Sequence, residues 1–176
     1  FKGSGKYIFA GGDVYEGNFV NSKFNGLGKY TFSDGDVYEG EWKDDKKKGR
    51  GTFTHINGAV YIGNWDNDFK SGTGTMKYAD GGAYIGNWKE DKFYGKGKLY
   101  NTKGAFYKQI SIGDWIYGTL IDGDVYTYKA TMSERKFTHK IKNFMHDDGL
   151  EDRTIISLPG YKDEALIEFQ KTLINS

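Results

Sequence analysis

The sequence predicts a mainly β protein, an elongated single-layer antiparallel sheet of stacked 23-residue β-hairpins followed by a C-terminal α-helical extension. Two observations lead to this fold class. The chain of 176 residues contains 26 Gly, 14 Tyr, 12 Phe and 4 Trp but one Pro, a composition typical of β-structure with many tight turns. A sequence period of 23 residues also divides most of the chain into equal units.

Tyrosines and paired glycines set this period. Tyrosines recur at a constant interval of 23 residues, at Tyr15, Tyr38, Tyr61, Tyr84 and Tyr107. Gly-x-Gly pairs keep the same interval, and their first residues are Gly3, Gly26, Gly49, Gly72 and Gly95. An aromatic or large apolar residue follows two positions after each pair: Tyr7, Tyr30, Phe53, Met76 and Leu99. Chance does not produce this register, so the chain is a repeat protein.

Strand geometry explains the residue types within one repeat. Side chains alternate across a strand, so Tyr38, Gly40 and Trp42 share one face. On the following strand the same alternation groups Gly49, Gly51 and Phe53. Glycine weakens a strand unless something must approach its backbone closely. We therefore expect an aromatic ring from the adjacent strand to lie flat across each missing side chain.

Turn signals separate the strands. Asp34-Gly35, Asn57-Gly58 and Asp80-Gly81 predict tight turns between hairpins, and longer polar loops such as 43–48 are expected to close the opposite end. With a strand spacing of about 4.8 Å, each repeat advances the sheet by about 10 Å and five repeats span about 50 Å.

The pattern Tyr-x-Gly-x-Trp/Phe, then Gly-x-Gly-x-aromatic, then Asp-Gly resembles the MORN repeat (membrane occupation and recognition nexus) over about residues 1–106. The resemblance implies a non-catalytic sheet whose face takes a partner helix or peptide, or a lipid. After Tyr107 the pattern degrades, because an insertion precedes Gly113-Asp-Trp115. We expect two parts, a repeat array over 1–126 with a degenerate last repeat and an extension over 127–176.

The extension breaks the period. Apolar spacing predicts a helix over about 132–145, although polar and apolar residues alternate at 136–142 and leave a strand open. A short strand is expected at 154–158. After Pro159-Gly160 a second helix is expected, with an apolar stripe that packs on the array. About 13 helical residues cover about 20 Å, so part of the array face would remain for another ligand.

The aromatic residues of the array are therefore the predicted partner-binding site. The set is Tyr15, Phe19, Tyr38, Trp42, Phe53, Tyr61, Trp65, Tyr84 and Trp88. The tyrosine rings over glycine are better explained as core, whereas the face as a whole has the composition of an interface hot spot. A basic cluster, Lys46, Lys47, Lys48 and Arg50, is a weaker candidate for lipid head groups, because Asp44 and Asp45 precede it.

Other chemistries receive little support. His139, His146, Asp147 and Asp148 are the one constellation that resembles a metal or acid/base site, and a helix C-terminus would explain His146 equally well. No glycine pattern opens a helix as a nucleotide site requires. We expect no catalytic residue, no metal and no cofactor. The net charge of +1 indicates no nucleic-acid partner, and no apolar run approaches a membrane span.

The sequence thus favours a scaffold module that binds a helix or extended segment of a protein partner within a larger cytoskeletal, ciliary or membrane-associated assembly. Two alternatives stay open. One is a peripheral membrane module for acidic phospholipids. The other is an accessory domain of a lipid kinase or methyltransferase, since the chain starts inside a repeat. A cytoplasmic or cytoskeletal location is favoured, with attachment to a membrane surface as an option.

Overall fold

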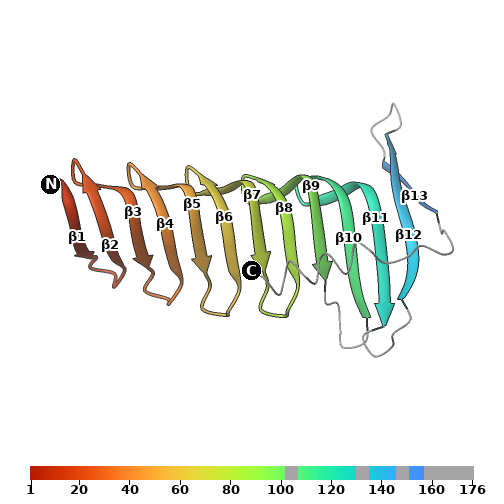
Figure 1. The fold of residues 1–176 in the computed structure, drawn as a ribbon, viewed down its shortest axis with the longest axis horizontal. Coiled ribbons are helices and arrows are strands. Elements are labelled where there is room, and N and C mark those ends of the chain that lie inside the picture. The colour runs from red at the N-terminus through yellow and green to blue at the C-terminus, as the bar shows by residue number, and fades with distance from the viewer. Residues whose placement is uncertain (102–106, 130–134, 146–150, 157–176) are drawn as a thin grey trace.

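The described part of the protein is one antiparallel sheet in which every strand pairs with its neighbours in sequence (Figure 1). The computed structural model describes residues 1–101, 107–129, 135–145 and 151–156. Its thirteen strands follow chain order across the sheet without a crossover. They are β1 Gly3–Ile8, β2 Val14–Val20, β3 Lys23–Thr31, β4 Val37–Lys43, β5 Lys46–Thr54, β6 Val60–Asp66, β7 Phe69–Lys77, β8 Ala83–Lys89, β9 Lys92–Asn101, β10 Tyr107–Ile116, β11 Thr119–Lys129, β12 Arg135–Met145 and β13 Glu151–Ile156.

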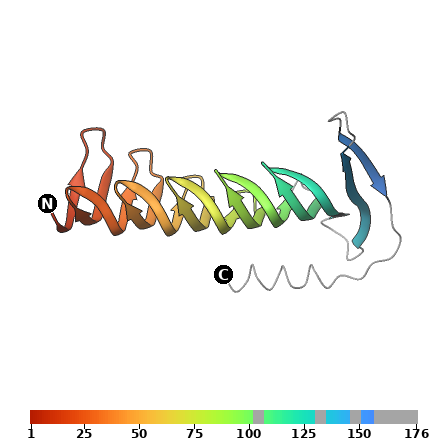
Figure 2. The ribbon, with the colours of Figure 1, turned by 90° about the horizontal axis from the view of Figure 1, so that it is seen from above.

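The sheet is a single elongated layer. Seen from above, its strands cross the long axis diagonally in a regular series, and β12 and β13 turn away from that line (Figure 2). Within the described residues all regular structure is β, and no helix there has the length and apolarity to cross a membrane. The predicted open sheet of stacked hairpins is therefore confirmed.

Two-residue turns form one edge of the sheet, where a longer polar loop was expected at 43–48. Asp44 and Asp45 alone connect β4 to β5, with φ of 48° and 68°, and Lys46 already belongs to the strand. Two consecutive left-handed residues are the signature of a type I′ turn, whose twist matches that of the flanking strands. Asn21-Ser22, Asn67-Asp68 and Glu90-Asp91 repeat this geometry. The expectation of a longer loop was wrong, because Asp, Asn, Ser and Glu here accept positive φ without glycine.

The Asp-Gly signals lie in five-residue connections along the other edge. Between β3 and β4, the Phe32 N–H donates to the Asp36 carbonyl at 2.9 Å and the Gly35 N–H donates to the Phe32 carbonyl at 3.0 Å. Gly35 has a φ of 99°, which favours glycine. Equivalent bonds close the connections at 9–13, 55–59 and 78–82. The prediction that these glycines lie in turns is therefore confirmed. The turns, however, are the five-residue connections and not the two-residue ones.

A bulge recurs in each hairpin beside the Gly-x-Gly pair. Gly40 pairs with Gly51 and Trp42 pairs with Lys47, so Glu41 alone faces the three residues 48–50. Gly49 lies in the bulge with a φ of 71°. The two glycines of the pair therefore have separate roles: the first supplies a left-handed backbone, and the second lies under an aromatic ring, as described below.

The array continues past its apparent end after a shift in register. Gly113 pairs with Gly97 and Trp115 with Gly95, as Gly86 and Trp88 pair with the preceding strand one repeat earlier. By this register Ser111, and not Tyr107, occupies the position that Tyr84 holds one repeat earlier. Ser111 is buried with 8% exposure. The insertion seen in the sequence is thus taken up by β9 and β10, which have ten residues each, against nine in β7 and seven in β8.

The extension contains strand where helix was expected. β12 spans Arg135–Met145, so the helix predicted over 132–145 was wrong and the strand alternative at 136–142 is correct. Its alternating pattern pairs with β11 through a bulge at Val125/Tyr126, and tertiary pairing overrides the helical spacing. A short strand predicted at 154–158 is found as Glu151–Ile156, and the helix expected after 160 lies outside the described residues.

Candidate functional site

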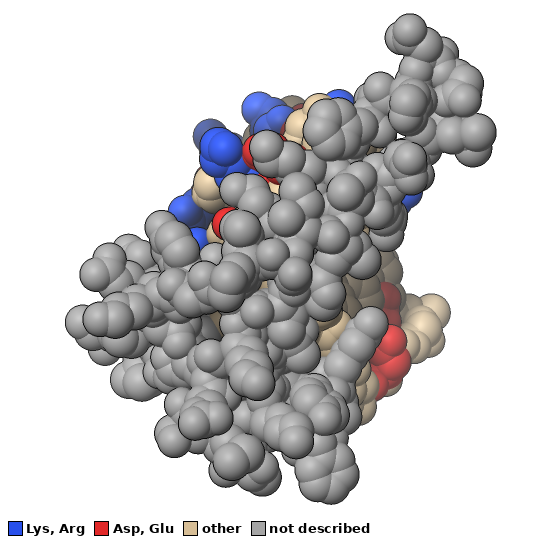
Figure 3. All heavy atoms as spheres, turned by 90° about the vertical axis from the view of Figure 1, so that its right-hand side faces the viewer, with Lys and Arg blue, Asp and Glu red and all other residues tan. Residues whose placement is uncertain are grey.

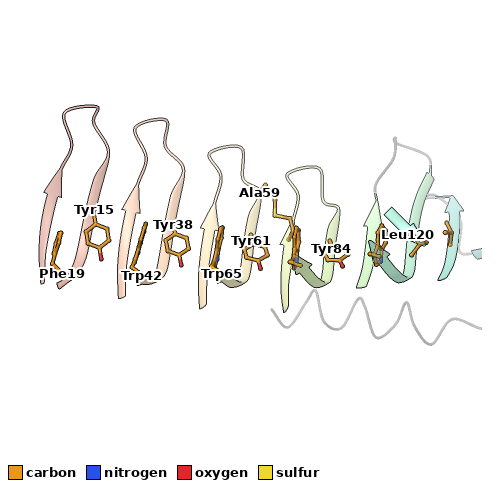
Figure 4. Close-up of a cluster of buried hydrophobic side chains, with 13 residues drawn as sticks. Tyr15, Phe19, Tyr38, Trp42, Ala59, Tyr61, Trp65, Tyr84 and Leu120 are labelled. Carbon is orange, nitrogen blue, oxygen red and sulfur yellow. The ribbon is translucent and has the colours of Figure 1, made fainter. Parts of the chain in front are cut away.

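One face of the sheet, here called the aromatic face, carries a row of buried aromatic rings, which we call the ladder (Figure 4). The first tyrosine of each repeat has 0% exposure: Tyr15, Tyr38, Tyr61 and Tyr84. Each ring covers a pair of glycines on neighbouring strands. A Cβ added to Gly51 would lie 2.6 Å from Cε2 and Cζ of Tyr38, and closer still to its Oη. The expected packing of a ring across a missing side chain is confirmed, and it lets a single-layer sheet bury tyrosine completely.

The polar atoms of these rings are satisfied within each repeat. The Tyr38 hydroxyl donates to the Glu41 carbonyl at 3.0 Å, and the other three tyrosines donate to the equivalent carbonyl at 2.9–3.0 Å. The Trp42 Nε1–H donates to the Gly28 carbonyl at 3.1 Å, a bond that Trp65, Trp88 and Trp115 repeat. Buried aromatic residues need such partners. Burial raises the pKa of Tyr15 to about 12, with the charge of Asp45 as a second cause.

The rings form one edge-to-face ladder across the repeats. Tyr38 lies 5.0 Å from Trp42 of its own repeat and 5.3 Å from Trp65 of the next, both at nearly right angles. The same alternation runs from Phe19 through Tyr84 to Trp115. Because each ring contacts both neighbours, the ladder joins successive hairpins into one core.

A second row of side chains lies over the tyrosines, spaced 23 residues apart, and we call it the covering row. Its members are Phe24, Lys47, Lys70 and Phe93. At the outer positions a phenyl ring stacks flat on the tyrosine, with 3.6 Å between the centroids of Tyr15 and Phe24 and likewise of Tyr84 and Phe93. The inner positions are lysines. The covering row is half-buried.

The inner lysines interact with the rings as cations. Lys47 Nζ lies 4.7 Å from the centroid of Trp65 and 5.6 Å from that of Tyr38. Burial lowers the pKa of Lys47 below its ordinary value, while Asp68 and Asp91 act in the opposite direction. Lys70 Nζ lies 5.5 Å from the centroid of Tyr61 and 3.6 Å from Asp91 Oδ1. Cation–π contacts thus replace ring stacking at the centre of the array.

Turn aspartates connect successive repeats at the edge of this face. Asp68 Oδ1 accepts a hydrogen bond from the Lys47 N–H at 2.9 Å, and the Asp68 N–H donates to the Lys47 carbonyl at 3.1 Å. Asp45 and Asp91 make the same pair of bonds to Phe24 and Lys70. These contacts fix the spacing of the covering row, since each member is held by the turn of the following repeat.

The structure places the predicted partner-binding residues unequally. The four ladder tyrosines have no exposed surface, and Phe19 and the three tryptophans of the set are 4–9% exposed. Phe53 is half-buried beside Lys47 and packs against the core. The ladder therefore forms the core of the sheet. Sequence reasoning did not select Phe24, Lys70 and Phe93, although their period of 23 residues was readable in the sequence.

The predicted basic cluster does not form one surface. Lys47 lies over the aromatic rings, and Lys48 Nζ pairs with Asp66 at 2.5 Å. Arg50 borders a hollow on the opposite face of the sheet. Viewed along the array from its β13 end, Lys and Arg of the described residues gather on one side, with acidic side chains among them (Figure 3). This interleaving weakens electrostatic attraction to anionic lipid.

The histidine and aspartate candidates do not assemble a site in the described part of the chain. No group of three metal-ligating side chains occurs there. His139 lies in β12, and residues 146–148 fall outside the described residues. His55 Nδ1 lies 2.9 Å from Asp36 Oδ2 at the edge of the sheet, where the carboxylate also accepts the Ile56 N–H. This pair fixes a connection between strands.

These features define a class of protein: an open β-repeat array with a shared aromatic core, which presents two extended faces. The MORN repeat family model matches residues 1–14, 15–37, 38–60, 61–83 and 84–106. The chain belongs to the MORN-repeat family. MORN repeats are commonly protein- or membrane-interaction modules and are generally non-catalytic. No curated protein matches the chain.

Proposed function

We propose that the protein is a non-catalytic scaffold module that binds a helix or extended segment of a protein partner along its aromatic face. The covering row is the observation that supports this. Phe24 and Phe93 remain half-buried after stacking on Tyr15 and Tyr84. Phe53 adds apolar surface between them. A partner would complete the burial of these rings, which sit on a rigid ladder and lose little side-chain freedom on binding.

The contact residues follow from burial. The predicted site Tyr15, Phe19, Tyr38, Trp42, Phe53, Tyr61, Trp65, Tyr84 and Trp88 acts in this proposal mainly by holding the covering row in line. Direct contact falls to Phe53, the edges of the indoles and the covering row itself. A partner helix lying along the array would meet one repeat about every 10 Å, close to the rise of seven helical residues.

The array offers a test that preserves its core. Lysine already occupies the inner covering positions, so Phe24→Lys with Phe93→Lys should fold while removing exposed phenyl surface. Leu27→Lys is the matched control, because Leu27 is 66% exposed and lies on the opposite face by strand alternation. The parent and the control should capture the same partner from native extract, and the double variant should lose it.

Two results would count against the proposal. Equal capture by all three proteins would move the interaction away from the aromatic face. Binding of the parent to vesicles containing anionic phospholipid, but to no protein, would favour the membrane alternative, which predicts a steep decrease of binding with added salt. Circular dichroism and urea unfolding establish beforehand that each variant is folded.

A further inference from the structure

The opposite side of the sheet, here called the back face, changes character along the array. The residue after each ladder tyrosine points to this face by strand alternation. It is Glu16 and Glu39 in the first two repeats, but Ile62 and Ile85 in the next two, and Ile112 follows Ser111 after the register shift. Because the core lies on the other face, packing of the ladder requires neither residue type here. The aliphatic substitution therefore needs another explanation.

Ile62 and Ile85 border a shallow hollow of about 440 Å³. Its lining includes Arg50, Ile62, Thr73, Ile85, Asn87 and Lys96. Ile62 is 40% exposed, whereas large aliphatic side chains are mostly buried in folded proteins. In the charged half of the back face the equivalent positions form a solvated row, where Lys6 pairs with Glu16 at 3.6 Å. The hollow described here lies in the aliphatic half, over β5 to β9.

Two cations flank the hollow. Within the described residues no carboxylate forms an ion pair with the Arg50 guanidinium, although Glu41 accepts the Arg50 backbone N–H at 2.8 Å. At the other end Lys96 Nζ lies 3.5 Å from Asp114 Oδ1, and its side chain is 86% exposed. Such a surface is complementary to an apolar segment with negative charge at both ends.

Strand spacing limits the shape of the ligand. Ile62 and Ile85 lie on strands two steps apart, about 10 Å, and Arg50 and Lys96 lie four steps apart, about 19 Å. Along a helix these distances correspond to about 7 and about 13 residues. In an extended strand the 10 Å step corresponds to about three residues, which would place successive side chains on opposite faces. A helix therefore fits the spacing of the two isoleucines.

We propose that the back face between β5 and β9 is a second docking surface, which binds an amphipathic helix of a protein partner with heptad-spaced aliphatic residues and an acidic residue near each end. This site is separate from the aromatic face and goes beyond the scaffold function proposed above. An anionic membrane fits less well, because Asp66 and Asp114 lie among the basic residues of this face in ion pairs.

A synthetic peptide pair tests the proposal with the full chain. The probe is a fluorescein-labelled, alanine-rich 21-residue peptide with leucines seven residues apart and two glutamates about 13 residues apart. The matched peptide carries lysine in place of the two glutamates. The parent should bind the glutamate peptide, measured by fluorescence anisotropy. The lysine peptide should bind at least about tenfold more weakly, since like charges would meet Arg50 and Lys96.

The first two repeats suggest a variant of the protein that should keep the fold. Ile62→Glu with Ile85→Glu installs the residue that the first two repeats carry at the same position, so the fold should persist. Binding of the glutamate peptide should weaken by about tenfold or more, because leucine side chains would lose their apolar contacts. Arg50→Gln, which leaves the aliphatic surface intact, should weaken it by about fivefold or less.

Several outcomes would overturn the proposal: no binding of the glutamate peptide to the parent, equal binding of both peptides, or unchanged binding by the Ile62→Glu/Ile85→Glu variant. The Phe24→Lys/Phe93→Lys variant should bind the probe like the parent. Loss of binding there would place the peptide on the aromatic face and would contradict a second surface. Failure of the aromatic-face proposal would leave this result unaffected.

Discussion

Adding one methyl group at Gly51 should destabilise the array, because the second glycine of each pair has no room for a side chain. The new Cβ would lie 2.6 Å from two ring carbons of Tyr38, a fully buried residue. Overpacking of this kind costs about 1–3 kcal/mol. Displacing the ring also threatens the hydrogen bond from its hydroxyl to the Glu41 carbonyl, worth about 1 kcal/mol. We expect Gly51→Ala to lower the free energy of unfolding by about 2–4 kcal/mol.

Urea unfolding followed by tryptophan fluorescence measures this loss. With a denaturant slope of about 2 kcal/mol per molar, the midpoint should fall by about 1–2 M. Gly11→Ala is the matched control, since nothing lies within 4 Å of its added Cβ. Gly58→Ala has equal space but a φ of 89°, so it should lose an intermediate amount, about 1–2 kcal/mol. A Gly51→Ala protein within about 0.5 kcal/mol of the control would refute the packing argument.

Three further perturbations follow from the same geometry. Lys47→Phe should raise the free energy of unfolding by about 0.5–1.5 kcal/mol, because it reproduces the stacking of Phe24 on Tyr15; a lower urea midpoint would contradict this. Asp68→Ala should lower it by about 1 kcal/mol through loss of the bond from the Lys47 N–H, and an unchanged midpoint would show that water replaces the carboxylate. Burial raises the pKa of Tyr15 to about 12, so its contribution to stability is complete below pH of about 10 and is lost as the pH rises toward 12. Burial also raises the pKa of Tyr30 to about 12, so the absorbance step at 295 nm near pH 12 should be smaller in Tyr15→Phe than in the parent, and the same curve for both proteins would exclude the assignment to Tyr15.

Much of the fold was readable from residue spacing alone. Strands alternate their side chains strictly, so a 23-residue period with aromatic and glycine residues two apart determined which residues share a face. It also determined that rings cover glycines, since glycine in a strand requires close approach from outside. Tyr38 over Gly51 is the direct outcome. These are local consequences of backbone geometry, and they needed no knowledge of the rest of the chain.

The tertiary structure decided what depends on pairing between strands. The turn at Asp44-Asp45 is tight because the bulge at Gly49 sets the register of β4 against β5, and the polar sequence of 43–48 does not reveal that register. Ser111 occupies the position of a ladder tyrosine because Gly113 pairs with Gly97, which places Ser111 opposite Leu99. Pairing with β11 made a strand of residues 135–145, whose spacing also fits a helix.

The sequence by itself determined the repeat, the faces of its strands and the ring-over-glycine core. Only the tertiary structure decided that Phe19 and the tryptophans are also buried and that the covering row lies over the tyrosines. Burial depends on neighbours 20 or more residues away: Lys47 covers the rings because the turn of the next repeat holds its backbone through Asp68. The sequence of a single strand does not show which residues of the next repeat will lie against it. The exposure of each side chain is therefore determined only when the hairpins stack.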